Sequence, residues 1–143
     1  MINSIVAGNW KMNKTPKEGK IFIKKMISDL DSLEDTNVII CPPFTGLTSL
    51  LKSSKYNLGA QNCYFEDSGA YTGEISVDML KSVGIQTVIL GHSERRTYFK
   101  EDDDLLKAKV TTALANEMEV IFCFGELLAE RKAGNHFKVV ERQ

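Results

Sequence analysis

Polar side chains follow directly after an apolar run near the middle of the chain. The run Thr87–Leu90 is followed by a glycine and then by His92, Ser93 and Glu94. In parallel α/β proteins, ligands bind at the carboxyl ends of the strands. A histidine there can give a proton or a hydrogen bond to a substrate oxygen near neutral pH. A lone histidine would more often be structural, so a functional role for His92 depends on whether other polar residues lie beside it.

A second apolar run ends in the same way. Ser4–Gly8 is followed by Asn9 and, two residues later, by Lys11, which places an amide and an ammonium at a strand end. Taken singly, an asparagine there would be a turn residue and a lysine would be a surface residue. The joint occurrence of Asn9, Lys11 and His92 at two strand ends makes them candidates for one site.

The composition bounds the possible partners. Of the 143 residues, 43% are hydrophobic and 26% are charged, which are ordinary globular values and predict one domain over residues 1–143. A net charge of −1 gives no reason to expect binding to nucleic acid or to an anionic membrane. No apolar run approaches the ~20 residues that span a bilayer, and the first residues do not resemble a secretory signal. The short basic spots Glu94-Arg95-Arg96 and Lys24-Lys25 are interpreted as solvated helix faces.

The cysteines indicate a reducing compartment. Cys41, Cys63 and Cys123 are odd in number, widely spaced and free of any C-x-x-C pair. This pattern predicts reduced thiols in a cytoplasmic protein, with neither a disulfide framework nor a zinc site.

Strands and helices are expected to alternate along the whole chain. The expected strands are short, rich in valine and isoleucine, and apolar nearly throughout, as in strands covered on both faces. They are Ser4–Gly8, Asn37–Cys41, Asn57–Gln61, Thr87–Leu90 and Glu119–Phe124.

The first expected helix carries the clearest start signal. Thr15 and Glu18 have capping-box spacing, with Pro16 at the first helical position. Its apolar stripe comprises Phe22, Ile23, Met26, Ile27 and Leu30. Further helices are expected from Thr45 to Ser53, from Ser76 to Val83, after Asp102-Asp103-Asp104 with Leu105, Leu106, Val110 and Leu114 on its apolar face, and from near Glu126 to the last residue.

Alternation of this kind requires a parallel sheet with right-handed crossovers, but does not specify which one. Five strands in 143 residues would suit a doubly wound, flavodoxin-like nucleotide binder. Two features argue against that fold. The turn at residues 9–13 has no glycine-rich phosphate cradle, and residues 64–75 form a long excursion of the kind that barrel enzymes use to build sites.

Several motifs resemble those of the triosephosphate isomerase family, in order and spacing along the whole chain. They are Asn9-Trp10-Lys11-Met12-Asn13, Ile40-Cys41-Pro42-Pro43-Phe44, Gly59-Ala60-Gln61-Asn62, Gly69-Ala70-Tyr71-Thr72-Gly73-Glu74, Gly91-His92-Ser93-Glu94-Arg95-Arg96 and Cys123-Phe124-Gly125-Glu126. The resemblance implies a (β/α)8 TIM barrel. Because such a barrel usually needs about 250 residues, the sequence is expected to cover a barrel truncated after strand five and part of the following helix, either as a shortened polypeptide or as part of a longer one.

The resemblance also implies roles for individual residues. His92 would be the electrophile in the interconversion of dihydroxyacetone phosphate and glyceraldehyde 3-phosphate, a reaction that needs no metal or organic cofactor. Lys11 and Asn9 would bind this small phosphorylated substrate, and Glu94 would pair with Lys11. Trp10 and Met12 are expected to fill the core, and His136 to be exposed.

The motif at residues 69–74 resembles the family's interface loop and implies a homodimer in the full-length form. Thr72 would reach the active site of a neighbouring subunit, Gly73 would permit the tight turn, and Tyr71 would add aromatic bulk. The alternative is a solvent-exposed loop. Aromatic residues at positions 64, 65 and 71 favour the interface.

The family's catalytic glutamate, its lid loop and its glycine-rich phosphate-binding turns match nothing in these 143 residues. The chain alone is therefore expected to be inactive, and its first and fifth strands are expected to expose open edges and apolar faces. The alternative function is that of a non-catalytic half-barrel that pairs with a partner or with its missing half.

Overall fold

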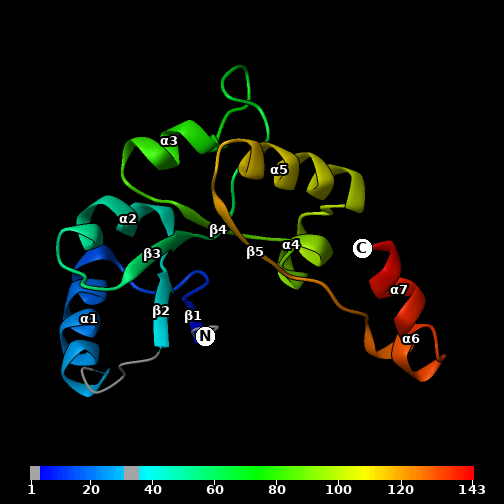
Figure 1. The fold of residues 1–143 in the computed structure, drawn as a ribbon, viewed down its shortest axis with the longest axis horizontal. Coiled ribbons are helices and arrows are strands. Elements are labelled where there is room, and N and C mark those ends of the chain that lie inside the picture. The colour runs from blue at the N-terminus through cyan, green and yellow to red at the C-terminus, as the bar shows by residue number, and fades with distance from the viewer. Residues whose placement is uncertain (1–3, 31–35) are drawn as a thin grey trace.

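Five parallel strands form one curved sheet, a half-barrel, in the computed structural model, which describes residues 4–30 and 36–143 (Figure 1). The strands are β1 Ser4–Asn9, β2 Thr36–Cys41, β3 Asn57–Ala60, β4 Thr87–Leu90 and β5 Glu119–Phe122. Their order in the sheet is their order in the chain, and each neighbouring pair is parallel. This sequential order argues against the flavodoxin-like alternative, in which the strand order reverses within the sheet.

The helices connect successive strands and follow the last one. They are α1 Pro16–Leu30, α2 Phe44–Leu51, α3 Val77–Ser82, α4 Ser93–Tyr98, α5 Asp103–Ala115, α6 Leu128–Lys132 and α7 His136–Arg142. Figure 1 shows α1, α2, α3 and α5 on the outside of the curved sheet, with α6 and α7 beyond the end of β5. No helix in residues 4–30 and 36–143 is long and apolar enough to cross a membrane.

Side-chain caps fix the starts of three helices, as the sequence predicts. The Thr15 backbone N–H donates to the Glu18 carboxylate at 2.8 Å, and the Glu18 N–H donates back to the Thr15 hydroxyl at 3.4 Å. Ser76 Oγ accepts the N–H of Met79 at 3.3 Å before α3. The Asp102 carboxylate accepts from Leu105 at 2.9 Å and starts α5. These bonds satisfy N–H groups that the first helical turn leaves without partners.

Each strand divides its side chains between two faces. Val38, Ile40, Val88 and Leu90 belong to the large cluster between the sheet and the helices. Alternate residues lie on the concave, inner face, where Ile39, Cys41 and Ile89 pack with Ile121 and Cys123. The expectation of strands covered on both faces is therefore correct for β2 and β4.

The same expectation is wrong for β1. Five of its six residues are exposed, including Ile5 at 62% and Val6 at 56%. Within the described residues β1 pairs only with β2, so neither of its faces is covered as those of β2 are. The predicted open edge is thus present at this strand.

Other expectations are also corrected by the packing. The helix expected to run on from Glu126 is two helices, separated by Gly134, whose φ of 73° interrupts the helix. The short helix α4 contains Arg95 and Arg96, which are expected on a helix, and Leu114 on α5 is 58% exposed because the buried face there is formed by Leu106, Lys109 and Ala113.

The burial of two side chains differs from that expected, and a third side chain is not among the described residues. Met12 is 96% exposed and fills no core, whereas Trp10 packs against the main cluster as expected. His136 is half-buried rather than exposed. The Leu30 side chain expected in the α1 stripe lies outside the described residues.

Candidate active site

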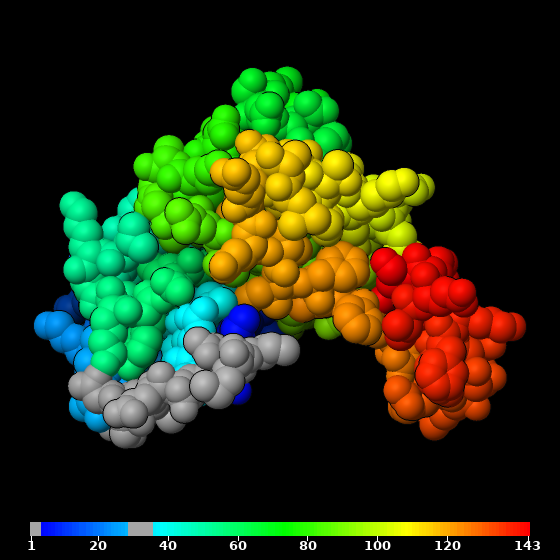
Figure 2. Space-filling view, viewed as in Figure 1, coloured from blue at the N-terminus to red at the C-terminus, as the bar shows by residue number. Residues whose placement is uncertain are grey.

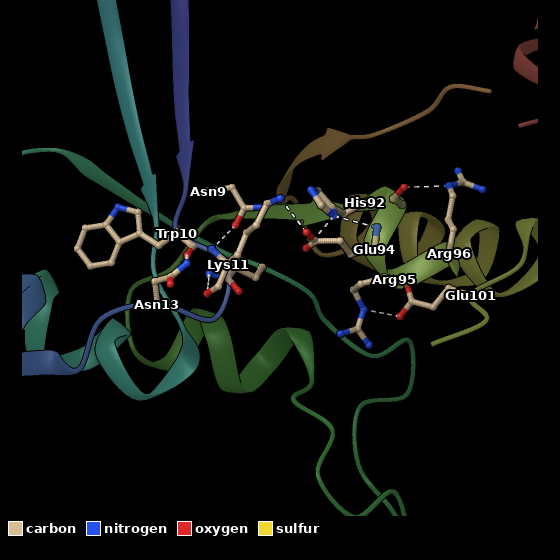
Figure 3. A network of polar contacts seen from close by, with 11 residues as sticks. Asn9, Trp10, Lys11, Asn13, His92, Glu94, Arg95, Arg96 and Glu101 are labelled. Atoms are coloured by element: carbon tan, nitrogen blue, oxygen red, sulfur yellow. Dashed lines mark hydrogen bonds and ion pairs between the residues drawn. The ribbon is translucent and has the colours of Figure 1, made fainter. Parts of the chain in front are cut away.

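The polar residues at the ends of β1 and β4 meet at one edge of the sheet (Figure 3). Asn9 is the last residue of β1, and His92 follows β4 after a single glycine. Lys11 Nζ donates to Glu94 Oε1 at 2.7 Å, which joins the turn after β1 to the first turn of α4. The chain separates these two residues by 83 positions, and the parallel sheet brings them together.

Lys11 has an unusual backbone conformation for a residue with a side chain. Its φ is 53°, in the left-handed region that L-residues seldom occupy. The Lys11 N–H donates to Asn9 Oδ1 at 2.9 Å. The oxygen of the Asn9 amide is therefore used within the turn, and its Nδ2 group is the donor that could meet a ligand.

His92 caps α4 through its ring. Nδ1 accepts the backbone N–H of Glu94 at 3.2 Å. A ring nitrogen that accepts a hydrogen bond carries no proton, so this bond favours a neutral imidazole with its proton on Nε2. Glu94 Oε2 lies 3.5 Å from the same Nδ1, a contact that would favour a charged ring. In the neutral ring that accepts this amide bond at Nδ1, the proton is on Nε2, which is then a donor.

Glu94 is an ionised partner rather than a proton carrier. The hydrogen bond from Lys11 lowers the pKa of its carboxyl below the ordinary 4.5. A carboxylate with a lowered pKa is almost fully ionised near neutral pH and is a weak base there. Glu94 can therefore fix the position of the Lys11 ammonium, but it is poorly suited to abstract a proton from carbon.

Arg96 holds the strand end that precedes His92. Its Nε donates to the Gly91 carbonyl at 2.8 Å, and its terminal nitrogens contact the Cys123 carbonyl at 3.3 Å and Asp103 at 2.7 Å. Gly91 has a φ of 77°, and a Cβ there would lie 2.5 Å from the Cys123 carbonyl oxygen. Only glycine fits this close approach between the ends of β4 and β5.

The solvated-face interpretation of Arg95 and Arg96 is therefore wrong. Arg95 Nε donates to Glu101 at 2.7 Å, and Arg96 binds the two strand ends described above. Sequence reasoning missed these roles because the partners are backbone carbonyls and a buried carboxylate from other elements. The glycine between β4 and His92 was the one local signal.

A surface hollow of about 770 Å³ lies next to this edge of the sheet, between α4 and the C-terminal segment. His92 lines it together with Arg96, Lys100 and Phe124. Asn9 and Lys11 are not among its lining residues, so the hollow covers only the β4 side of the predicted site.

The expected interface loop contains three aromatic rings in contact, tilted against one another. The Tyr64 ring centroid lies 4.5 Å from that of Phe65 and 4.8 Å from that of Tyr71. Tyr71, Thr72 and Gly73 are exposed, and a Cβ added at Gly73, whose φ is 95°, would meet no atom within 4 Å. The loop therefore presents its tip to solvent in this single chain.

The three cysteines are free thiols. Burial raises the pKa of Cys41 and of Cys63 to about 11, and it also raises the pKa of Cys123. Thiols with raised pKa values remain protonated at neutral pH and are poor nucleophiles and poor metal ligands. Among the residues that the structure describes, no cluster of three or more His, Cys, Asp or Glu side chains could hold a metal ion.

Comparison with known proteins identifies the family. The family model described as triosephosphate isomerase matches residues 4–143. The chain belongs to the triosephosphate isomerase family. The half-barrel is accordingly part of a TIM barrel, and the predicted fold class is confirmed.

Individual members of the triosephosphate isomerase family cover almost all of this chain. The protein of that name from Flavobacterium psychrophilum is 50% identical over 142 residues, which are 97% of this chain and 57% of the relative. Those from Flavobacterium johnsoniae and Finegoldia magna are 48% and 49% identical, and each match covers 100% of this chain and 58% of the relative. The chain thus spans somewhat more than half the length of these curated relatives.

Proposed function

We propose that this chain carries the electrophile and the cationic group of a triosephosphate isomerase active site. The observation that supports this most strongly is the ion pair between Lys11 and Glu94 beside the ring of His92. It gathers an ammonium and an imidazole at the carboxyl edge of a parallel sheet. The proposed reaction interconverts dihydroxyacetone phosphate and glyceraldehyde 3-phosphate.

Each residue has a defined part in this proposal. The Lys11 ammonium attracts the dianionic substrate and stabilises negative charge on its oxygen. His92 Nε2–H donates to the carbonyl oxygen, gives that oxygen its proton as the enediolate forms, and takes a proton back from the neighbouring hydroxyl oxygen. Asn9 adds an amide donor, and Glu94 holds the ammonium in place. The steps are proton transfers, so the proposal includes no metal and no organic cofactor.

A polypeptide of these 143 residues alone is proposed to be inactive. The reaction needs a base that moves a proton between adjacent carbons, and Glu94 is engaged with Lys11 and has a lowered pKa. Loss of a general base typically lowers the rate by about two to four orders of magnitude. The base, the lid and the main phosphate contacts are proposed to come from the part of the barrel that these residues do not include.

The assembled enzyme is proposed to be a cytoplasmic homodimer without nucleic-acid or membrane partners, with residues 1–143 folding as one unit. The exposed loop tip at Tyr71, Thr72 and Gly73, with aromatic rings in contact behind it, supports the dimer. Three free, largely buried thiols support a reducing compartment.

One observation favours a second candidate, a non-catalytic half-barrel that binds its missing half or another chain. Ile5 and Val6 of β1 are more than half exposed, on a strand whose outer edge pairs with nothing in the described residues. An edge of this kind is a template for strand addition.

Histidine replacement tests the proposed function. The chain is combined with the C-terminal part of the Flavobacterium psychrophilum relative, and isomerase activity is measured in a coupled assay. His92→Gln is expected to lower kcat/KM by about 10²–10⁴-fold, the usual contribution of a general acid or base. The control is His136→Gln at the start of α7, the other histidine of the chain, which is expected to keep full activity. Equal activities of the two variants would contradict the proposal, and a combination that assembles without activity would favour the second candidate.

A further inference from the structure

The main chain of Lys11 is held from both sides by side-chain amides. Its N–H donates to Asn9 Oδ1 at 2.9 Å, and its carbonyl accepts from Gln61 Nε2 at 2.9 Å. The residue between these bonds has a φ of 53°, a conformation that costs free energy for any residue with a Cβ. Such a conformation persists only where neighbouring groups determine it.

Gln61 joins the ends of three strands. It follows Ala60, the last residue of β3, and its Nε2 also donates to the Cys41 carbonyl at the end of β2 at 2.8 Å. The Cys41 carbonyl accepts in addition from the Trp10 N–H at 3.0 Å, in the turn after β1. Both neighbours of the Gln61 amide are carbonyl oxygens, which only accept, so its NH2 group must face them.

We propose that Gln61 is a positioning residue that holds Lys11 in the left-handed conformation from which the ammonium reaches Glu94. Both amide hydrogens of its side chain are used on carbonyls, and one of these belongs to Lys11 itself. Without this donor, the Lys11 carbonyl is free to rotate, and the residue relaxes to a negative φ that directs the side chain elsewhere. That this geometry serves catalysis rests on the proposed function. The hydrogen bonds and the Lys11 conformation themselves do not depend on it.

Two replacements of Gln61 and one control separate positioning from general stability. Gln61→Glu keeps the size of the side chain but turns a charged acceptor toward two carbonyls. Gln61→Met keeps the approximate volume, has no donor and adds no charge. It provides the same test if the Gln61→Glu chain does not fold. The control is Asn116→Asp at the end of α5, where Nδ2 donates to the Thr112 carbonyl at 3.0 Å. It makes the same chemical change at an amide–carbonyl bond away from Lys11.

The readouts are NMR signals of the labelled 143-residue chain, with no substrate present. The first is the scalar coupling across the hydrogen bond from Gln61 Nε2 to the Lys11 carbonyl, together with the Lys11 three-bond HN–Hα coupling that reports φ. The second is the pKa of the Glu94 carboxyl, which faces both Lys11 and His92 and is lowered chiefly by Lys11.

Both Gln61 variants are expected to lose the cross-bond coupling, to shift the Lys11 φ coupling and to raise the Glu94 pKa toward 4.5, its ordinary value. The Asn116→Asp chain is expected to match the parent in all three. An unchanged Lys11 φ coupling and an unchanged Glu94 pKa in Gln61→Met would overturn the proposal. Because no substrate is used, this outcome is independent of whether the assembled barrel is an isomerase.

Discussion

Lys11 and Glu94 form an ion pair in which both side chains keep substantial exposure, 51% and 40%. Exposed ion pairs add little to stability because water screens them and both side chains lose freedom. Stability therefore does not account for a lysine held at a φ of 53°. The pair instead fixes the direction of an ammonium at a strand edge, as a binding site requires. Since the Glu94 pKa is lowered on folding, the pair is present above the ordinary pKa of 4.5 and is lost as the pH falls through the lowered value.

The cysteines give a prediction at the same scale. Cys41 and Cys63 are 0% and 1% exposed, and burial raises their pKa values from 9.0 to about 11. A rise of two pKa units lowers the thiolate fraction about 100-fold. In the native chain at pH 8, iodoacetamide is expected to alkylate Cys123 first, because it is only half-buried.

Peptide mass spectrometry over a time course measures the three alkylation rates. In denaturant the rates are expected to become similar, which serves as the control for intrinsic reactivity. Native Cys41 or Cys63 reacting as fast as Cys123 would contradict the burial described above.

At the scale of elements, a buried ionic cluster joins α4, α5 and the segment after β3. Glu101 Oε1 accepts from Lys109 Nζ at 2.6 Å and from Arg95 Nε at 2.7 Å, and Lys109 also donates to Asn62 at 3.0 Å. Lys109 is 2% exposed and Glu101 is 5% exposed. Because α4 carries Glu94, this cluster anchors the helix that supports the Lys11 pair.

Glu101→Leu is expected to lower the free energy of unfolding by about 3–5 kcal/mol, since it leaves the Lys109 ammonium buried without its counter-charge. The double replacement Glu101→Leu with Lys109→Leu is expected to recover much of this loss, because the fully buried charge is removed and Arg95, which also loses Glu101, is 27% exposed to water. Urea denaturation of the parent, both single variants and the double variant gives the four free energies of unfolding. Together they form a double-mutant cycle that measures the coupling between the two side chains. Additive losses in the double variant would show that the two side chains are not coupled.

The sequence was sufficient to predict those helix starts and strands that depend only on neighbouring residues. The capping box at Thr15 and Glu18, the cap at Ser76 and the positions of all five strands could be predicted, because each depends on neighbouring residues. The burial of Lys109 could not be predicted, since a buried ammonium is acceptable only when carboxylate and amide partners arrive from other elements.

Some residues of the candidate site could be predicted from the sequence and others could not. Lys11 and His92 could be proposed because they are chemical groups that follow strand-like runs. The contacts of Gln61 and Arg96 could not, because their partners are main-chain carbonyls that have no signature in the sequence. The roles themselves remain predictions for the experiments above.

At the scale of the whole molecule, the half-barrel leaves surfaces uncovered. β1 exposes Ile5 and Val6, and Figure 2 shows the C-terminal segment as a lobe beside the rest of the chain. This lobe is attached through Arg142, which donates to Asp103 at 3.0 Å, and through the Gln143 side chain, which bonds the Gly125 backbone at 2.8 and 3.2 Å. Arg142 and Gln143 also line the hollow beside His92, and catalysis of this type requires a site closed to water.

The central claim is that these residues supply His92 and Lys11 but not the catalytic base. The most direct test is the intact mass of the purified chain, paired with a coupled isomerase assay on the same sample, alone and after addition of the C-terminal part of a relative. For a polypeptide of 16.0 kDa we predict no activity alone and activity after the addition, whereas a much larger mass with activity would mean that these residues are part of a longer enzyme. Full activity of the 16.0 kDa chain by itself would contradict the account.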